Sequence, residues 1–208
     1  MHVKIPPKAP IYRRTQRGVA LVTAVIMLLV ITMLAIAGAR SALDTKRSSR
    51  NQRDFDIALQ AAEAALRDAE LDIASTGSRA WMFDQTQDFY FAQGCGTSTA
   101  KSQPDIGLCD TRNSPAGTNI WDTVNWTAAN GQTTVEYGTF TGLSFPTGTG
   151  LTPSRKPRYL IEVIQDKPLG DSVTDIRYIY RVTAVGFGPN DTTRAMVQMY
   201  FRKPLPNS

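Results

Sequence analysis

The longest uncharged run of the chain is an apolar stretch near its N-terminus. It extends from Gly18 to Ala39, 22 residues in which only Thr23 and Thr32 carry polar side chains. An α-helix of this length rises about 33 Å, enough to cross the hydrocarbon core of a bilayer. We therefore predict a transmembrane helix at residues 19–39.

The helical pattern continues beyond this apolar run. No Pro or Gly interrupts the chain between Ala39 and Gly77. Apolar residues at alternating intervals of four and three then indicate one face of an amphipathic helix at residues 40–75. The members of this stripe are Phe55, Leu59, Ala62, Leu66, Ala69 and Ile73. We expect them to pack on the protein's own β-sheet, with a coiled-coil seam as the alternative.

Alternating apolar and polar residues in the last third of the chain predict β-strands. The predicted strands are Thr133–Phe140, Arg158–Gln165, Asp175–Phe187 and Thr192–Arg202. The turn-forming sequence Gly188–Asp191 joins the last two as an antiparallel hairpin. We therefore predict an α+β fold, in which the long N-terminal helix packs on a three- to four-stranded antiparallel β-sheet formed by residues 133–208.

Between the helix and these strands, residues 76–132 are rich in Gly, Ser, Thr, Asn and Asp, which predicts an irregular region. The two cysteines of the chain, Cys95 and Cys109, both lie there. In an oxidising compartment they would form a disulfide that closes a loop, whereas in a reducing cytoplasm they would be unpaired thiols. We favour the disulfide, because a membrane span can deliver the C-terminal part outside the cytoplasm. The aromatic residues of this region are either a binding surface or, as we favour, anchors that hold the loop to the core.

The basic charge of the chain is concentrated in residues 1–18, which we interpret as a cytoplasmic leader peptide. This segment holds five Lys and Arg and no acid, so the remaining 18 of the 23 basic residues balance the 18 Asp and Glu. The pI of about 9.4 therefore does not indicate a nucleic-acid partner, and we expect none.

The orientation of the span is not fixed by flanking charge, because five further Lys and Arg follow it between Arg40 and Arg53. Long domains translocate largely regardless of such charges. Together with the cysteine pair, this favours a single-pass protein whose C-terminal part is periplasmic.

The sequence offers little catalytic chemistry. The only histidine is His2, inside the basic leader, so a chain without the leader lacks the commonest general base and a common metal ligand. No phosphate-binding loop, dinucleotide fingerprint or hydrolase motif is present. We predict that the protein is not an enzyme, has no catalytic residues, and needs no cofactor or metal.

The Arg17-Gly18-Val19 junction, the apolar helix and the sheet-bearing C-terminal part together resemble a type IV pilin. A closer resemblance, to the PilX family of minor pilins, is carried by short segments of the N-terminal half and of the strands. These segments are Gly18–Val22, Met27–Val30, Asn51–Asp54, Ala58–Glu70 and Tyr180–Gly186.

The resemblance implies a type IV pilin fold and a processing route. Prepilin peptidase would cleave after Gly18, and the new N-terminus at Val19 would be N-methylated. The protein would be stored in the bacterial inner membrane and added by the inner-membrane assembly platform to a cell-surface pilus, beside other minor pilins and the major pilin. Its implied role is to prime or join the fibre and so to support pilus assembly, cell adhesion and twitching motility.

One position departs from the common pilin pattern. Most pilins carry Glu at the fifth mature position, where its carboxylate neutralises the N-terminal ammonium of a neighbouring subunit, and this chain carries Thr23 there. A buried ammonium without its counter-charge is costly. A subunit that cannot supply this pairing suits a unique position, and we therefore predict a place at the fibre tip.

Three other functions stay open at this point. The first is a tip adhesin, in which the cysteine-closed region binds a surface ligand. The second is a K-type minor pseudopilin of type II secretion, which also lacks the Glu but usually has a larger inserted helical domain. The third is a bitopic membrane protein with a periplasmic binding, sensor or enzyme domain.

Processing gives the first test. The chain of 208 residues has a mass of 22.8 kDa, so removal of 18 residues lowers its mass by about 2 kDa. We expect this shift only when the protein is expressed together with prepilin peptidase, and we expect Edman sequencing of the product to start at methylated Val19. A mature N-terminus elsewhere would exclude the pilin interpretation.

Overall fold

The computed structural model describes residues 17–74, 78–100, 104–112, 117–128, 132–166 and 177–203. The predictions for residues 1–16 of the leader and for Asp175 and Ile176 lie outside these residues. The chain divides into two compact units, and the boundary between them in the sequence lies between Ser49 and Arg50. We call the unit from Arg50 to Ser208 the head.

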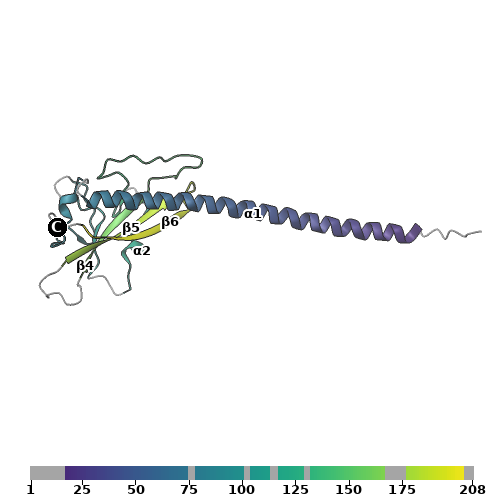
Figure 1. Cartoon of the computed structure of the whole chain (residues 1–208), viewed down its shortest axis with the longest axis horizontal. Helices are drawn as coiled ribbons and strands as arrows, with labels where there is room; N and C mark the ends of the chain where they lie inside the picture. Colours follow the sequence, from purple (N-terminus) through teal and green to yellow (C-terminus); the bar gives the residue numbers. More distant parts are fainter. Residues whose placement is uncertain are drawn as a thin grey trace, which may run out of the picture. The chain divides into compact units, whose positions relative to one another are not determined.

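The first helix, α1, runs without a break from Arg17 to Ile73 and contributes to both units (Figure 1). Its continuity follows from the sequence, because neither Pro nor Gly lies between Ala39 and Gly77 to interrupt the backbone ladder. In the first unit, all side chains from Gly18 to Ser49 are exposed.

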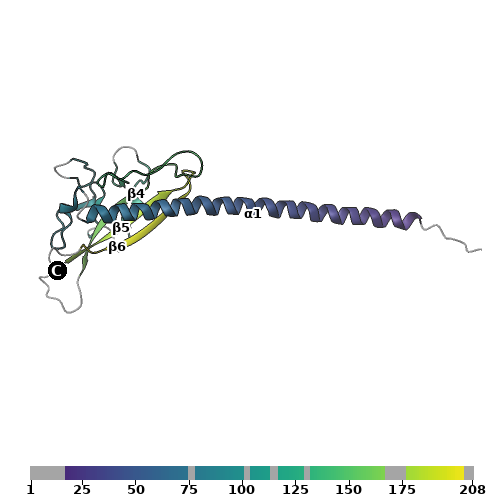
Figure 2. The ribbon, with the colours of Figure 1, turned by 45° about the horizontal axis from the view of Figure 1, so that its top comes forward.

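The head is a sheet of six strands in its described part, with the C-terminal half of α1 across one face (Figure 2). The strands are β1 (Ala92–Cys95), β2 (Leu108–Asp110), β3 (Val135–Glu136), β4 (Arg158–Asp166), β5 (Arg177–Phe187) and β6 (Arg194–Phe201). Their order is β1-β2-β4-β5-β6, with β3 paired to one end of β4. Two short helices, η1 (Ala80–Met82) and α2 (Ile120–Thr123), lie in the connections.

The α+β class and the long helix on a sheet are confirmed, but the predicted strand number and the purely antiparallel pairing were wrong. The strands β3 to β6 pair in antiparallel fashion, whereas β1 pairs with β2, and β2 with β4, in parallel. Both extra strands come from the region predicted to be irregular. At four and three residues they are too short to show a recognisable alternation of apolar and polar side chains.

The sheet separates two apolar layers. Toward α1, side chains from β4 and β5 pack with the buried end of the helix; this core includes Ala65, Ala69, Ile73, Tyr159, Ile161, Tyr180, Val182 and Ala184. The opposite face is covered by the segment around α2, where Trp126 packs with Cys109, Leu160, Val185 and Phe187.

The backbones of α1 and β5 approach closely because the residues at their contact have small side chains or none. A Cβ atom added at Gly186 would lie 2.1 Å from the carbonyl oxygen of Ala58 and 2.3 Å from the amide nitrogen of Ala62. Ala58, Ala61 and Ala62 are all buried at this point. The helix backbone therefore rests directly on the strand backbone, which no larger residue at position 186 would permit.

We predict that Gly186→Ala lowers the free energy of unfolding of the head by about 1–3 kcal/mol, the usual cost of overpacking, because backbone atoms rather than a flexible side chain must move. Thermal unfolding of the full chain in detergent measures the change. Gly38→Ala is the matched control, since a Cβ there meets no atom within 4 Å. Equal stability of Gly186→Ala and the parent would contradict this packing.

Candidate assembly site

The apolar segment of α1 needs lipid or protein around it. Its large apolar side chains between Val19 and Ile36 are 49–69% exposed in the isolated chain. Burying one such side chain contributes about 1.5–3 kcal/mol, so thirteen of them left in water would impose a cost of tens of kcal/mol. Within the described residues, one helix is long and apolar enough to cross a membrane, and it is α1, whose most apolar stretch has a mean hydropathy of 3.0.

The polar groups of this segment are already satisfied within the helix. The Thr23 hydroxyl lies 3.1 Å from the carbonyl oxygen of Val19 and 3.0 Å from that of Ala20, and it donates to this pair of acceptors. The Thr32 hydroxyl donates to the Leu29 carbonyl at 2.8 Å. Neither threonine therefore needs a partner outside the helix, and neither contributes a charge.

The predicted cleavage junction lies in the first turn of α1. Gly18 and Val19 are both exposed, and a Cβ atom added at Gly18 would meet no atom within 4 Å. This places the Gly18–Val19 bond on an open surface of the first unit.

The predicted helix–sheet stripe is divided between the core and the surface. Ala62, Ala69 and Ile73 are buried, Leu59 and Leu66 are half-buried, and Phe55 is 45% exposed. The most buried face is centred on smaller and charged residues that the apolar pattern did not select, namely Ala58, Ala61, Ala65, Asp68 and Asp72. The sequence signal that could have identified this face is the helical spacing of these five residues, at intervals of three, four, three and four.

A buried ion pair explains the two acids on this face. The Arg79 side chain is fully buried and donates from Nε and Nη2 to the Asp72 carboxylate, with Nη2 2.7 Å from Oδ2. Arg79 Nη1 donates to the carbonyl oxygens of Pro104 and Ile106 at 2.9 and 2.7 Å. The Tyr159 hydroxyl donates to Asp72 Oδ2 at 2.9 Å. Through Arg79, the end of α1 is thus tied to the segment that enters β2.

The neighbouring acid, Asp68, ties α1 to the loop after β3. The Gly138 amide donates to Asp68 Oδ2 at 2.8 Å, and the Thr141 hydroxyl donates to Oδ1. Burial raises the pKa of Asp68 above its usual value, and the hydrogen bonds from Thr141 and Gly138 oppose that rise. Burial also raises the pKa of Tyr159 well above its usual range, so this phenol stays a hydrogen-bond donor at neutral pH.

The cysteine-closed region is part of the sheet rather than a separate loop. Cys95 and Cys109 form a disulfide and stand opposite each other in the β1–β2 pairing. On the same face of the sheet, Glu162 is fully buried and accepts hydrogen bonds from Arg181 at 2.7 and 2.9 Å. The Arg181 guanidinium lies 4.5 Å from the centre of the Trp121 ring and so connects this ion pair to α2.

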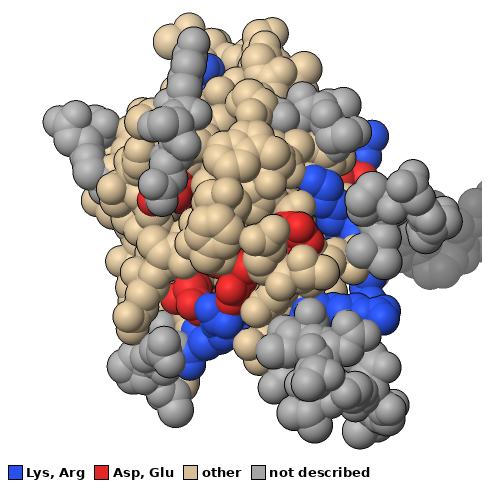
Figure 3. All heavy atoms as spheres, turned by 90° about the vertical axis from the view of Figure 1, so that its left-hand side faces the viewer, with Lys and Arg blue, Asp and Glu red and all other residues tan. Residues whose placement is uncertain are grey.

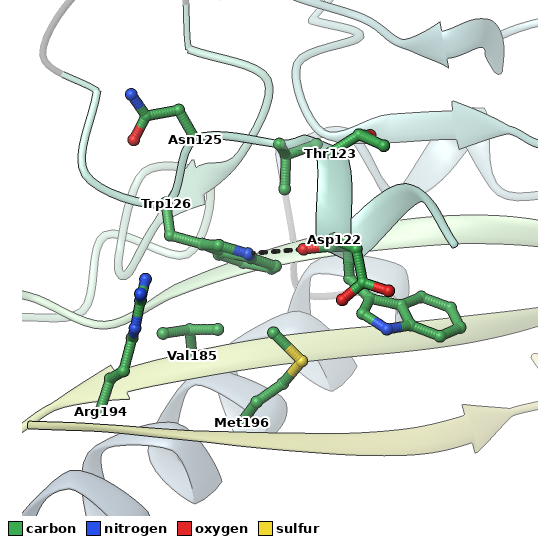
Figure 4. Close-up of a pocket in the computed structure, with 9 residues that line it drawn as sticks. Asp122, Thr123, Asn125, Trp126, Val185, Arg194 and Met196 are labelled. Carbon is green, nitrogen blue, oxygen red and sulfur yellow. Dashed lines mark hydrogen bonds between the residues drawn. The ribbon is translucent and has the colours of Figure 1, made fainter. Parts of the chain in front are cut away.

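A groove of about 550 Å³ lies between the α2 segment and the outer face of β5 and β6. Figure 4 shows the Trp126 indole on one side of it and Val185 and Met196 on the other, with Arg194 at one end. The Trp126 Nε1 donates to the carbonyl oxygen of Trp121 at 3.0 Å, which fixes the indole in place. The described residues contain no group of three or more His, Cys, Asp or Glu placed to hold a metal ion.

The face of the head at the C-terminal end of α1 is mixed in character. Figure 3 shows uncharged residues over much of this face, with acidic side chains across its middle and basic side chains next to them. Near this end of the helix, Trp81 and Phe89 are 53% and 67% exposed and both contact Tyr90.

An apolar helix that continues into a head, where it packs on a sheet, defines a subunit with the type IV pilin fold. Residues 17–67 match the PilX N-terminal family, and residues 87–203 match the family of the C-terminal part of type IV pilus assembly protein PilX. The chain belongs to the PilX family of type IV pilus assembly proteins, minor pilins that are structural components of the pilus rather than enzymes. No curated protein and no solved structure gives a significant match.

The buried pair allows a direct test. We predict that Arg79→Met lowers the free energy of unfolding by about 3–5 kcal/mol, because it leaves the Asp72 carboxylate buried without its counter-charge. The matched control is Arg67→Met on α1, the helix that carries Asp72, where an exposed pair with Glu70 at 2.5 Å should contribute at most about 1 kcal/mol. Chemical denaturation of both variants measures the difference. If the two variants lost similar amounts of unfolding free energy, the buried pair would not stabilise the head more than an exposed pair does.

Proposed function

We propose that this PilX-family subunit is processed to begin at Val19, waits in the bacterial inner membrane with its head in the periplasm, and joins the type IV pilus at or near its tip. The observation that carries the proposal is the uncovered apolar segment of α1. Lipid can solvate it before assembly, and neighbouring helices can cover the same surface in a fibre.

Thr23 supports the tip position. Its hydroxyl is satisfied by its own helix and it brings no carboxylate to a neighbouring N-terminus. An ammonium group buried beside it in a fibre would lack a counter-charge, at a cost of several kcal/mol. A subunit of this kind is tolerated where only one such contact is made and is unfavourable as a repeating unit of the shaft.

The expected partners follow from this position. They are prepilin peptidase for the Gly18–Val19 bond, the inner-membrane assembly platform, other minor pilins, and the major pilin below the tip. Adhesion and twitching motility depend on the fibre, so we expect loss of this protein to reduce both through the number of pili.

The cysteine-closed region supports an assembly role over a receptor role. Cys109 and Trp126 are buried and belong to the core behind the sheet. The fully buried Cys109 side chain is not available to a surface ligand, and its disulfide joins β1 to β2 within the sheet. The family match also favours the pilus over the K-type pseudopilin of type II secretion as the system that uses this subunit.

Immunogold labelling of sheared pili tests the tip position. We expect gold particles at one end of each fibre for the parent protein. Thr23→Glu supplies the missing carboxylate, so we expect this variant to label the shaft as well. Thr32→Glu is the control, because it places the same charge in the same segment away from any N-terminus, and it should not give shaft labelling. Uniform labelling of the shaft by the parent protein would refute the tip position.

A further inference from the structure

The two edges of the sheet differ in how well they are protected. At one edge, β1 has four residues, with register shifts on both sides of Gly94, whose φ of 77° is left-handed. At the other edge, β6 has eight residues, contains neither Pro nor Gly, and pairs with β5 without a register shift. No strand in the described part of the chain pairs with the other side of β6. Long regular edges of this kind are templates for pairing with another strand.

The hairpin fixes which backbone groups of β6 are free. The Gly188 amide donates to the Thr193 carbonyl at 2.8 Å, so these two residues form a hydrogen-bonded pair. Hydrogen-bonded and non-hydrogen-bonded pairs alternate along an antiparallel ladder. The residues whose N–H and C=O groups point away from β5 are therefore Arg194, Met196, Gln198 and Tyr200.

The side chains of the same four residues are exposed on the outer face of the sheet, including Met196 at 45% and Tyr200 at 63%. This face carries the groove between Trp126 and the pair Val185 and Met196 (Figure 4). A strand laid along β6 would place every second side chain on this face. One apolar side chain of such a strand would then reach the groove, while its backbone pairs with the free edge.

Charge indicates what kind of strand fits. Arg194 stands at one end of β6, Arg202 and Lys203 follow the other end, and no acid occurs between Thr192 and Lys203. Arg202 pairs with Asp166, whereas Arg194 makes no ion pair within the described residues. A second copy of β6 in antiparallel register would bring Arg194 close to the partner's Arg202, and opposed like charges destabilise a strand pair. An acidic strand from a different protein avoids this repulsion.

We propose that the free edge of β6 is a docking site for an extended segment of another protein, with alternating apolar side chains and an acidic residue near each end. Main-chain hydrogen bonds to β6 hold the segment, the groove receives one of its apolar side chains, and the basic ends of β6 select its charge. The site does not depend on where in a fibre this subunit lies.

Synthetic peptides test the site on the full chain in detergent. Two peptides of the same length as β6 share an alternating Thr-Val centre, and one carries Glu and the other Lys at both ends. We expect the Glu peptide to bind roughly tenfold more tightly than the Lys peptide, because its ends meet Arg194 and Arg202. Hydrogen-exchange mass spectrometry should show that the bound Glu peptide slows exchange in residues 194–201.

Two pairs of variants separate backbone pairing from charge. Gln198→Pro removes a free N–H from the edge, while Gln198→Ala loses the same side-chain bond to Thr183 and keeps that N–H. We expect only the proline variant to lose binding. Arg194→Glu tests charge without altering the backbone and should abolish the preference for the Glu peptide, whereas Arg67→Glu on α1 should leave it unchanged.

Several outcomes would overturn the proposal. These are absence of binding by both peptides, equal binding of both peptides to the parent protein, and unchanged exchange in β6. Concentration-dependent protection of β6 without peptide would instead assign the edge to a second copy of the chain and would also overturn it. None of these results depends on whether the subunit is processed or reaches a fibre tip.

Discussion

The apolar segment of α1 is the constraint on which the rest of the structure depends. An uncharged helix surface of 22 residues that no described part of the chain covers is unfavourable in water, so this segment needs another medium around it. Lipid and packed helices are both suitable, because the helix satisfies its own backbone and threonine hydroxyls in either. One segment can therefore serve a membrane-bound and a fibre-bound state without refolding.

The head holds its part of the same helix by different means. There α1 contacts the sheet through alanines and Gly186, at a distance that only small residues allow, and the end of the helix is fixed by the Asp72–Arg79 pair and by Asp68. These contacts specify one position of the helix along the sheet. A shift of the helix would separate the buried Asp72–Arg79 pair and would make larger side chains clash with backbone atoms at Gly186. The parallel strands β1 and β2 add the disulfide on the far side of the helix contact.

Sequence patterns predicted the elements with strong local signals. The absence of Pro and Gly predicted the continuous helix, and Gly188–Asp191 predicted the β5–β6 hairpin. The patterns failed where structure depends on distant partners. β1 and β2 are defined by pairing with each other and with β4, and the buried face of α1 is defined by Gly186 and Arg79, which an apolar stripe in the helix alone does not reveal. Leu59, Leu66 and Phe55 fit the stripe but lie toward its exposed side.

Photo-crosslinking from the apolar segment of α1 tests most directly whether this segment exchanges lipid for neighbouring helices on assembly. A photoreactive amino acid at Ile26, which is 57% exposed in the isolated chain, reports what surrounds this surface. In cells that cannot assemble pili, we expect crosslinks to phospholipid, and in sheared, purified pili we expect crosslinks to the helix of a neighbouring subunit. The account would be contradicted if the protein occurred in purified pili with Ile26 still crosslinked only to lipid, or if Ile26 were surrounded by protein before any fibre formed.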